Sequence, residues 1–259
     1  MSERPTPVKT LIAGQLRVEV YRSRSELGIA SAYDAAARMQ HLLSSQERIR
    51  AVFAAAPSQN EFLAALAATP DLDWGRIDAF HMDEYIGLPD NAPQGFGYFL
   101  RERLFDLVRP GQVEYINGNA ADLQAECERY SALLTEKPID IICAGIGENG
   151  HMAFNDPHVA DFEDSQTIKV VALDDTCRMQ QVHDGAFPTF DDVPKHALTL
   201  TMPAFLATKH LYCMVPGPTK TEAVARTVNE PISTACPATI MRRHQSAVLY
   251  VDLEAAADI

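Results

Sequence analysis

Short runs of apolar and β-branched residues alternate with longer helix-patterned segments along this chain of 259 residues. Seven of the runs are expected to be strands, at 16–22, 50–56, 76–82, 139–145, 196–202, 210–215 and 246–252. Helical patterns fall between them, at 25–46, 58–68, 119–136 and 219–228. Several runs are almost continuously apolar, as strands covered on both faces are. The alternation predicts an α/β fold with a mostly parallel, doubly wound sheet, helices on both faces, and a ligand site at the carboxyl ends of the strands.

Length and composition favour one large domain. At 259 residues and 47% hydrophobic, the chain can bury both faces of such a sheet. No linker rich in Gly, Ser or Pro divides it, so we expect a single domain over residues 1–259. Residues 158–194 differ from the rest because they are acid-rich with few apolar positions. We expect this segment to be either a mobile lid over the ligand site or an ordinary surface excursion.

The charge of the chain excludes several classes of partner. Lys and Arg number 22 against 35 Asp and Glu, and the formal net charge is −13. No broad positive field therefore gathers nucleic acid or an anionic membrane, and an anionic substrate must be held by a few placed cations. Because no run of about 18 apolar residues occurs and the N-terminus lacks an apolar signal core, neither membrane spanning nor secretion is expected.

Cysteine and histidine spacing argues against a metal centre. The five cysteines include no CxxC pair, and the eight histidines include no HExxH or comparable pairing. An odd, scattered set of cysteines also fits no disulfide framework, so we expect reduced thiols and a cytoplasmic location. No metal and no other cofactor is predicted.

Two adjacent acids, Asp83 and Glu84, follow the strand expected at 76–82. A carboxylate at a strand's carboxyl end, partly shielded from water, has a raised pKa that suits a general base. Exposed acids are common, so this feature alone does not separate a base from an ordinary surface pair.

A histidine follows the strand expected at 139–145, within the stretch GIGENGHMAFNDP. The glycines of this stretch, including Gly145 and Gly147, allow the backbone to adopt positive φ and to pass close to a ligand. Asn149 and Asp156 are near enough in sequence to orient His151, which then suits a proton shuttle. The alternative is a core histidine beside a turn.

Two patterns predict helix starts that attract anions. Ser58 and Thr219 each follow an expected strand and each have Glu three residues later, which is the pattern of a capping box. Lys220 lies in the first turn of its helix, where the dipole disfavours a cation by roughly 0.3–1 kcal/mol. A phosphate or carboxylate bound there would reverse the sign of that cost. A capped helix without a ligand and a solvated lysine are the alternatives.

Four stretches of the chain resemble one enzyme family: FHMDEYIGLP from Phe80, GIGENGHMAFNDP from Gly145, VPKHALTLTM from Val193 and PGPTKTEAV from Pro216. They resemble the glucosamine-6-phosphate deaminase (isomerase) family, within the wider group that includes 6-phosphogluconolactonases. The resemblance covers about residues 51–252. It implies a Rossmann-like α/β fold, usually a homo-oligomer, with a sugar-phosphate substrate and with no redox cofactor or catalytic metal.

The resemblance also implies roles for individual residues. In that family a histidine helps to open the sugar ring, a carboxylate moves a proton from C2 to C1, and the resulting imine is hydrolysed to fructose 6-phosphate and ammonia. Asp83 then matches the C2 base with Glu84 beside it, and His151 matches the ring-opening acid and base. Lys220 matches the phosphate-binding lysine, and Arg178 matches the phosphate-binding arginine.

Three positions depart from the family's usual pattern. Asn149 stands where an aspartate is usual, so we expect His151 to lose stabilisation of its charged form and relay through that position to fail. Asp156 stands where a glutamate is usual, and holds His151 only if its loop moves inward. Ala-Pro-Ser-Gln replaces a Gly-Gly-Thr phosphate loop; proline lacks an N–H, but Ser58 and Gln59 can still donate.

These observations leave three hypotheses of different kinds. The first is aldose–ketose isomerisation and deamination of an amino-sugar phosphate. The second is hydrolysis of a lactone of the 6-phosphogluconolactone type. The third is a sugar-phosphate binding or regulatory protein whose relay has weakened at Asn149.

Overall fold

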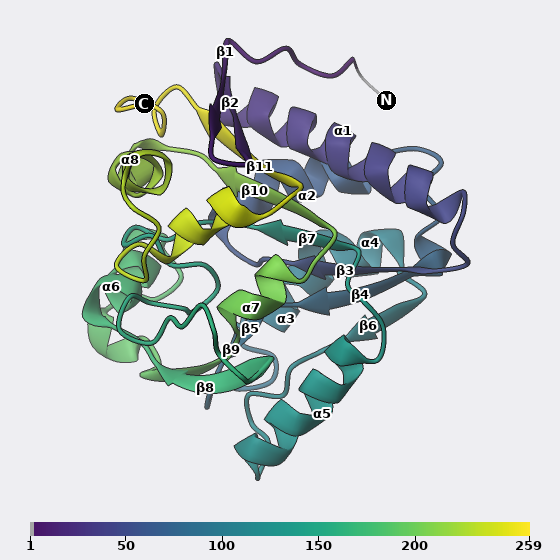
Figure 1. Ribbon diagram of the computed structural model, residues 1–259. Helices are drawn as coiled ribbons and strands as arrows, with labels where there is room; N and C mark the ends of the chain where they lie inside the picture. The colour runs from purple at the N-terminus through teal and green to yellow at the C-terminus, as the bar shows by residue number, and fades with distance from the viewer. Residues whose placement is uncertain (1–2) are drawn as a thin grey trace.

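An eight-stranded sheet forms the centre of the structure, a computed structural model that describes residues 3–259 (Figure 1). The strand order is β1-β2-β11-β10-β7-β3-β4-β6, and neighbouring strands are parallel except in the β1–β2 hairpin. This topology confirms the predicted α/β fold with a mostly parallel sheet. The strands are β1 (Lys9–Ala13), β2 (Leu16–Tyr21), β3 (Ile49–Phe53), β4 (Ile77–His81), β6 (Gln112–Glu114), β7 (Ile141–Ala144), β10 (His210–Val215) and β11 (Ala247–Asp252).

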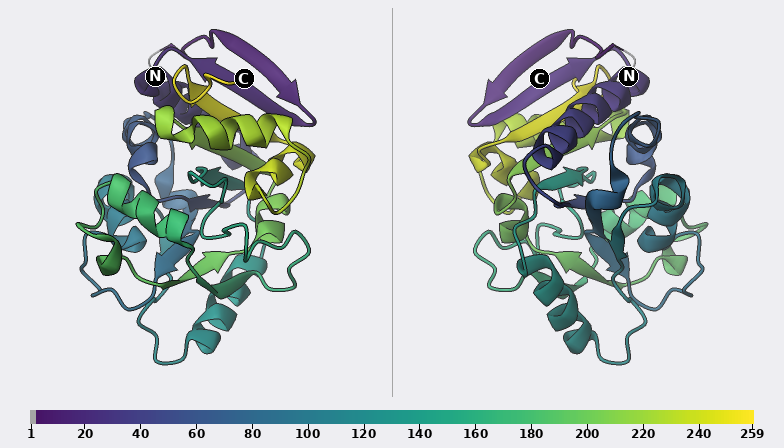
Figure 2. Two further views of the ribbon diagram at one scale, coloured as in Figure 1. Left: turned by 90° about the vertical axis from the view of Figure 1, so that its left-hand side faces the viewer. Right: turned by 90° about the vertical axis from the view of Figure 1, so that its right-hand side faces the viewer.

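Helices cover both faces of this sheet, as the apolar strands require (Figures 1 and 2). Successive residues of β7 alternate between the two cores: Ile142 belongs to one and Cys143 to the other. Residues of α1, α2 and α3 pack on the face of Cys143, and residues of α5, α7 and α8 pack on the face of Ile142. The helices are α1 (Arg24–Leu43), α2 (Asn60–Ala67), α3 (Phe96–Leu100), α4 (Asp106–Val108), α5 (Leu123–Thr135), α6 (Asp175–His183), α7 (Met202–Leu206) and α8 (Thr221–Asn229).

None of these helices is both long and apolar enough to cross a membrane, within the part of the chain that the structure describes.

A second, antiparallel sheet lies below the first in Figure 1, with the order β5-β9-β8. Its strands are β5 (Asp83–Tyr85), β8 (Ile168–Ala172) and β9 (His196–Leu200). The strand expected at 196–202 is therefore real but does not join the main sheet, because β9 pairs antiparallel with β5 and β8. This small sheet carries Asp83 at the start of β5, directly beyond the end of β4.

The segment 158–194 has regular structure and contributes to an apolar cluster outside the two main cores. It contains β8, α6 and a short 3₁₀ turn at Phe190–Asp192. Cys177 and Phe187 of this segment belong to a third apolar cluster, together with Tyr85 and Phe154. The segment thus buries more apolar surface than its acid-rich composition indicates. Whether it moves as a lid stays a prediction.

Candidate active site

A cavity of about 250 Å³ opens at the carboxyl ends of β3, β4, β7 and β10. The order of the sheet reverses direction between β3 and β7, the position at which open α/β sheets bind ligands. Backbone turns after these four strands form most of the wall. The lining residues are Arg24, 54–59, Met82, Asp83, Phe96, 145–147, His151, Ala153, Phe154, Gln180, Gln181, Asp184 and 216–220.

Asp83 places a carboxylate in this cavity without a protein partner. The residue is 6% exposed, and within residues 3–259 its side-chain oxygens accept no hydrogen bond and form no ion pair. Burial, and then the nearby charge of Glu84, raise the pKa of Asp83 well above its ordinary value. These are the surroundings of a general base, because a raised pKa strengthens the carboxylate as a proton acceptor.

Glu84 does not line this cavity but lines a separate hollow together with Gly95 and Gly97. Its carboxylate accepts hydrogen bonds from the backbone N–H groups of Tyr85 at 2.9 Å, Phe96 at 3.0 Å and Gly97 at 2.8 Å. Burial nevertheless raises the pKa of Glu84, and the three hydrogen bonds offset only part of this upward shift. Glu84 is therefore a fixed charge behind Asp83 and does not line the cavity.

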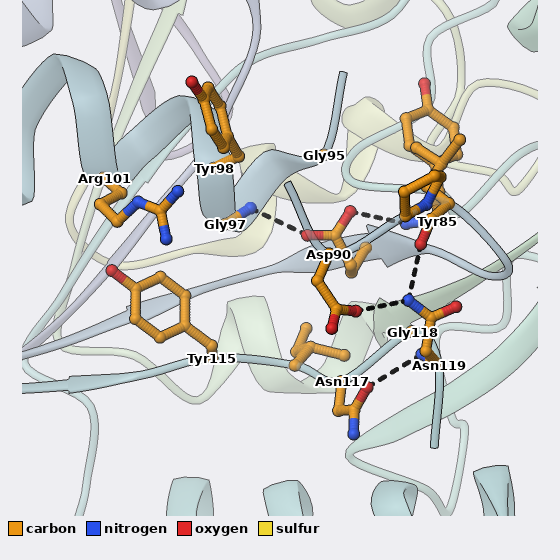
Figure 3. A pocket seen from close by; sticks show the side chains of 14 residues that line it. Tyr85, Asp90, Gly95, Gly97, Tyr98, Arg101, Tyr115, Asn117, Gly118 and Asn119 are labelled. Carbon is orange, nitrogen blue, oxygen red and sulfur yellow. Dashed lines mark hydrogen bonds between the residues drawn. The ribbon is translucent and has the colours of Figure 1, made fainter. Parts of the chain in front are cut away.

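The same hollow has polar walls. In Figure 3, Tyr98, Arg101 and Tyr115 lie on one side, and Asp90 accepts a hydrogen bond from Asn119 at 2.8 Å on the other.

His151 is held against the glycine turn that follows β7. The backbone N–H of Gly147 donates to the carbonyl of His151 at 2.9 Å. A Cβ atom on Gly147 would lie only 2.0–2.4 Å from three ring atoms of His151, so any larger residue there displaces the imidazole. Gly150 has φ of +86°, a conformation that favours glycine. The glycines of this stretch thus bring the backbone against the imidazole.

Asn149 and Asp156 lie behind His151, on the side of Nδ1. Asn149 Oδ1 lies 2.7 Å from His151 Nδ1, and Asp156 Oδ1 lies 3.0 Å from it. Both oxygens are acceptors, so Nδ1 carries a hydrogen and neutral His151 has Nε2 as its free acceptor. Burial alone would raise the pKa of Asp156, but hydrogen bonds from His151 and Asn149 hold it below its ordinary value. The shorter aspartate thus reaches the imidazole.

Lys220 supplies a buried cation at the turn after β10. It is 5% exposed, and its ammonium has no hydrogen bond or ion pair within residues 3–259. Burial lowers the pKa of Lys220. The charges of Asp184 and Glu148, which make no direct contact with the ammonium group, partly offset this shift. A buried cation that lines a cavity without a direct partner is suited to bind an anionic group of a ligand.

The two predicted capping boxes are wrong. A 3₁₀ turn precedes α2 and another precedes α8, so the N-caps of these helices fall on Gln59 and Lys220, and neither makes a side-chain cap. Ser58 instead accepts a hydrogen bond from Gln59 Nε2 at 3.1 Å. Both residues line the cavity, and Gln59 also packs against Gly145.

Arg178 does not reach the cavity. Its guanidinium donates to the carbonyls of Phe190 at 2.9 Å and Val193 at 3.1 Å, and it stacks 3.9 Å from the Phe190 ring centroid. In this conformation Arg178 fastens α6 to the 3₁₀ turn at Phe190–Asp192.

Sequence reasoning missed four polar residues of the cavity: Arg24, Gln180, Gln181 and Asp184. Arg24 follows β2, whose carboxyl end lies on the same edge of the sheet. The rule that ligand-binding residues follow the carboxyl ends of parallel strands therefore also applies to Arg24. It is anchored to Glu61 and to the Pro57 carbonyl, each at 3.1 Å. The other three lie on or just after α6. They do not follow the end of a strand of the main sheet, so the same rule does not predict them.

One group near the cavity has the residue types of a metal site. The ligand atoms of His151, Asp156 and Cys177 lie within 4.8 Å of one another. However, Asp156 Oδ1 is already hydrogen-bonded by Asn149 and lies against His151, and burial raises the pKa of the Cys177 thiol well above its ordinary value. The donor set therefore fits a hydrogen-bonded cluster better than a metal ion.

The fold and this cavity define an α/β protein with an acid–base centre and a buried cation in one pocket. A sequence model of the family described as "Glucosamine-6-phosphate isomerases/6-phosphogluconolactonase" matches residues 22–250. The chain therefore belongs to this family.

Two individual relatives of the chain are named glucosamine-6-phosphate deaminases. A glucosamine-6-phosphate deaminase of Listeria monocytogenes serotype 4a (strain HCC23) is 34% identical over 200 residues, 77% of this chain and 83% of that protein. One from Bacillus thuringiensis (strain Al Hakam) is 35% identical over 184 residues, 71% of this chain and 68% of that protein.

Solved structures show the same fold. A monomeric glucosamine-6-phosphate deaminase has a TM-score of 0.86 at 29% identity, over 93% of this chain and 99% of that one. A 6-phosphogluconolactonase from Thermotoga maritima has a TM-score of 0.74 at 19% identity, over 91% of this chain and 98% of that one.

Proposed function

We propose that the protein converts glucosamine 6-phosphate and water into fructose 6-phosphate and ammonia. Family membership and the 34% and 35% identity to two deaminases support this reaction over lactone hydrolysis. The observation that carries the proposal is the joint presence of Asp83, His151 and Lys220 on the wall of one cavity. Each has the surroundings that a different step of the reaction needs.

The phosphate is bound at the Lys220 end of the cavity. An anion there offsets the cost of burying an ammonium group that has no protein partner among the described residues. Ser58, on the 3₁₀ turn after β3, supplies a further donor, and Arg24 lies at the same turn. Gln59 lines the same end of the cavity, but its amide already donates to Ser58 Oγ and to the Met214 carbonyl. Since Arg178 is engaged elsewhere, Arg24 takes the place of the second cation in this proposal.

His151 opens the sugar ring. With Nδ1 bound to Asn149 and Asp156, neutral His151 takes the proton of the C1 hydroxyl at Nε2 and returns it to the ring oxygen. The open form exposes the proton on C2. Asp83 removes it, a step that its raised pKa favours, and delivers it to C1, while one proton passes from the amino nitrogen to O1 so that an imine is left at C2. Water then adds to the C2 imine, and the carbon–nitrogen bond breaks to release ammonia.

The test is ammonia release from glucosamine 6-phosphate, with loss of deuterium from a C2-labelled substrate, for wild type, Asp83→Asn and Lys220→Met. We expect wild type to do both. Asp83→Asn should lose C2 exchange while still binding phosphate, and Lys220→Met should raise KM by roughly 10- to 100-fold because it loses a charge-assisted contact.

Other outcomes would redirect the assignment. Acid release from 6-phosphogluconolactone without ammonia would move the protein to the lactonase branch. Tight binding of the sugar phosphate with no turnover, insensitive to Asp83→Asn, would make it a binding protein.

Assembly and location form part of the same proposal. A homo-oligomer in the cytoplasm is the expected setting, supported by family membership and by five free, buried cysteines. A monomeric deaminase is among the structural neighbours, so the two states compete directly. Light scattering coupled to size-exclusion chromatography decides between them: a mass of 28.5 kDa means a monomer.

A further inference from the structure

The orientation of the Asn149 amide is fixed by its neighbours. The backbone N–H of His151 points at this side chain with a distance of 3.0 Å, and a backbone N–H can only donate. The oxygen of Asn149 must therefore face His151, where it also accepts from Nδ1 at 2.7 Å. The amide nitrogen consequently faces the opposite way.

Two carboxylates accept hydrogen bonds from the amide nitrogen of Asn149. Asn149 Nδ2 donates to Asp156 Oδ1 and to Asp174 Oδ2, each at 3.0 Å. With two hydrogens given and two bonds accepted, every hydrogen-bonding position of the amide is used. Asp174 is itself fixed, because its other oxygen caps α6 by accepting the backbone N–H of Cys177 at 2.6 Å. Its own N–H donates to Asp156 Oδ2 at 3.1 Å.

We infer that Asp174 is a positioning residue for His151 and acts through the amide of Asn149. Asp174 and Asp156 together prevent the amide from rotating, so its oxygen stays on Nδ1 and Nε2 remains the acceptor that faces the substrate. Asp174 touches neither the imidazole nor the cavity. The catalytic meaning of this contact rests on the proposed function, in which His151 opens the ring.

The inference explains the asparagine at position 149. In the pattern usual for the family, two acids stand behind the histidine, at the positions of Asn149 and Asp156. Here two acids are again present, but they are Asp156 and Asp174, and the amide joins them. An aspartate at position 149 would bring three carboxylates together with no hydrogen between them, which is unfavourable in a partly buried site. Restoring the usual residue alone should thus harm this protein.

A double-mutant cycle tests this arrangement. Asn149→Asp and Asp174→Asn should each lower kcat/KM by roughly 10- to 100-fold, because each leaves partly buried polar groups facing like groups. Asparagine is also a good N-cap, so α6 should stay folded in Asp174→Asn. The double variant reverses donor and acceptor across this contact. It should recover to within about tenfold of wild type, a coupling expected only for residues that interact.

Nuclear magnetic resonance of ¹⁵N-labelled histidine supplies a readout that needs no turnover. In the neutral, ligand-free protein we expect the His151 proton on Nδ1, and in Asp174→Asn a mixture of the two tautomers. The matched control is Asp122→Asn, the same change at the exposed N-cap of α5, which should alter neither tautomer nor kcat/KM.

The inference is overturned if Asp174→Asn keeps the wild-type tautomer and rate. A double variant no better than the poorer single variant overturns it as well. If wild type releases no ammonia, the proposed reaction fails, and the tautomer measurement still decides the role of Asp174.

Discussion

Asp83 and Glu84 are adjacent in the sequence, yet β5 sends them to opposite sides. One becomes a carboxylate free to react, and the other becomes a carboxylate fixed by three backbone N–H groups. Glu84 therefore raises the pKa of Asp83 without lining the substrate cavity. No pattern in the sequence separates the two roles, because an alternating strand determines only that the two side chains point apart.

Replacement of Glu84 by glutamine tests this division. Glu84 is the second cause, after burial, of the raised pKa of Asp83. The base must be ionised, so kcat/KM falls as the pH drops through that pKa. In Glu84→Gln the pKa is lower, and we expect the acid limb of the pH profile to move to lower pH. An unchanged acid limb would contradict the division, and the exposed Glu102→Gln serves as the control.

At the scale of elements, the main helices and strands were predictable from periodicity, and the positions of four site turns followed from the ends of strands. The small sheet was not predictable. An apolar run such as β9 has the same appearance whether it joins a parallel sheet or pairs with β5, since only its partner differs. Sequence reasoning also left α6 unassigned, because a helix that faces the cavity with Gln180 and Gln181 lacks a strong apolar stripe.

The contact between α1 and α2 depends on a glycine. A Cβ on Gly28 would lie 2.6 Å from the Cβ of Glu61 and 2.9 Å from the backbone nitrogen of Phe62. Backbone atoms cannot yield as a side-chain end can, so the two helices must separate. We expect Gly28→Ala to destabilise the fold by about 1–2 kcal/mol, despite the roughly 1 kcal/mol gained in helix propensity.

Urea denaturation measures this effect. Gly75→Ala is the matched change, because its Cβ meets only a side-chain oxygen of Asp73 at 3.3 Å, and it should stay within about 0.5 kcal/mol of wild type. A Gly28→Ala protein as stable as the control would show that the helices can separate without loss.

The segment 158–194 is expected to be either a mobile lid over the cavity or an ordinary surface excursion, and ligand binding distinguishes the two. Its helix α6 brings Gln180 and Gln181 to the cavity, while Val171, Phe187 and Val193 of the same segment pack in a cluster outside the main cores. Hydrogen exchange at residues 175–186 should slow when inorganic phosphate or substrate binds in wild type, and should slow less in Lys220→Met at the same ligand concentration. Equal exchange with and without ligand would mark the segment as an ordinary surface excursion.

At the scale of the whole molecule, the site combines residues from Arg24 to Lys220, and the sheet gathers them by aligning strand ends. The sequence motifs predicted Asp83, His151 and Lys220 because each directly follows a strand. The family resemblance predicted a phosphate contact for Arg178, but its guanidinium binds carbonyls of its own segment. No motif predicted the contact of Asn149 with Asp174 across 25 positions. Side-chain contacts of that range depend on the packing of loops, which local patterns do not encode.

The buried Lys220 links the site to the stability of the whole fold. Burial lowers its pKa from an ordinary value of 10.5, so between the two values the unfolded chain binds more protons than the folded one. Stability of the ligand-free protein should therefore rise with pH across that window, and Lys220→Met should abolish the rise and be more stable at neutral pH. Phosphate at 100 times the wild-type Kd should add about 2.7 kcal/mol to wild type but only about 0.4–1.4 kcal/mol to the variant, whose Kd is expected to be roughly 10- to 100-fold higher. Calorimetry at several pH values, with and without phosphate, checks both effects, and equal stabilisation of the two proteins by phosphate would place the anion elsewhere.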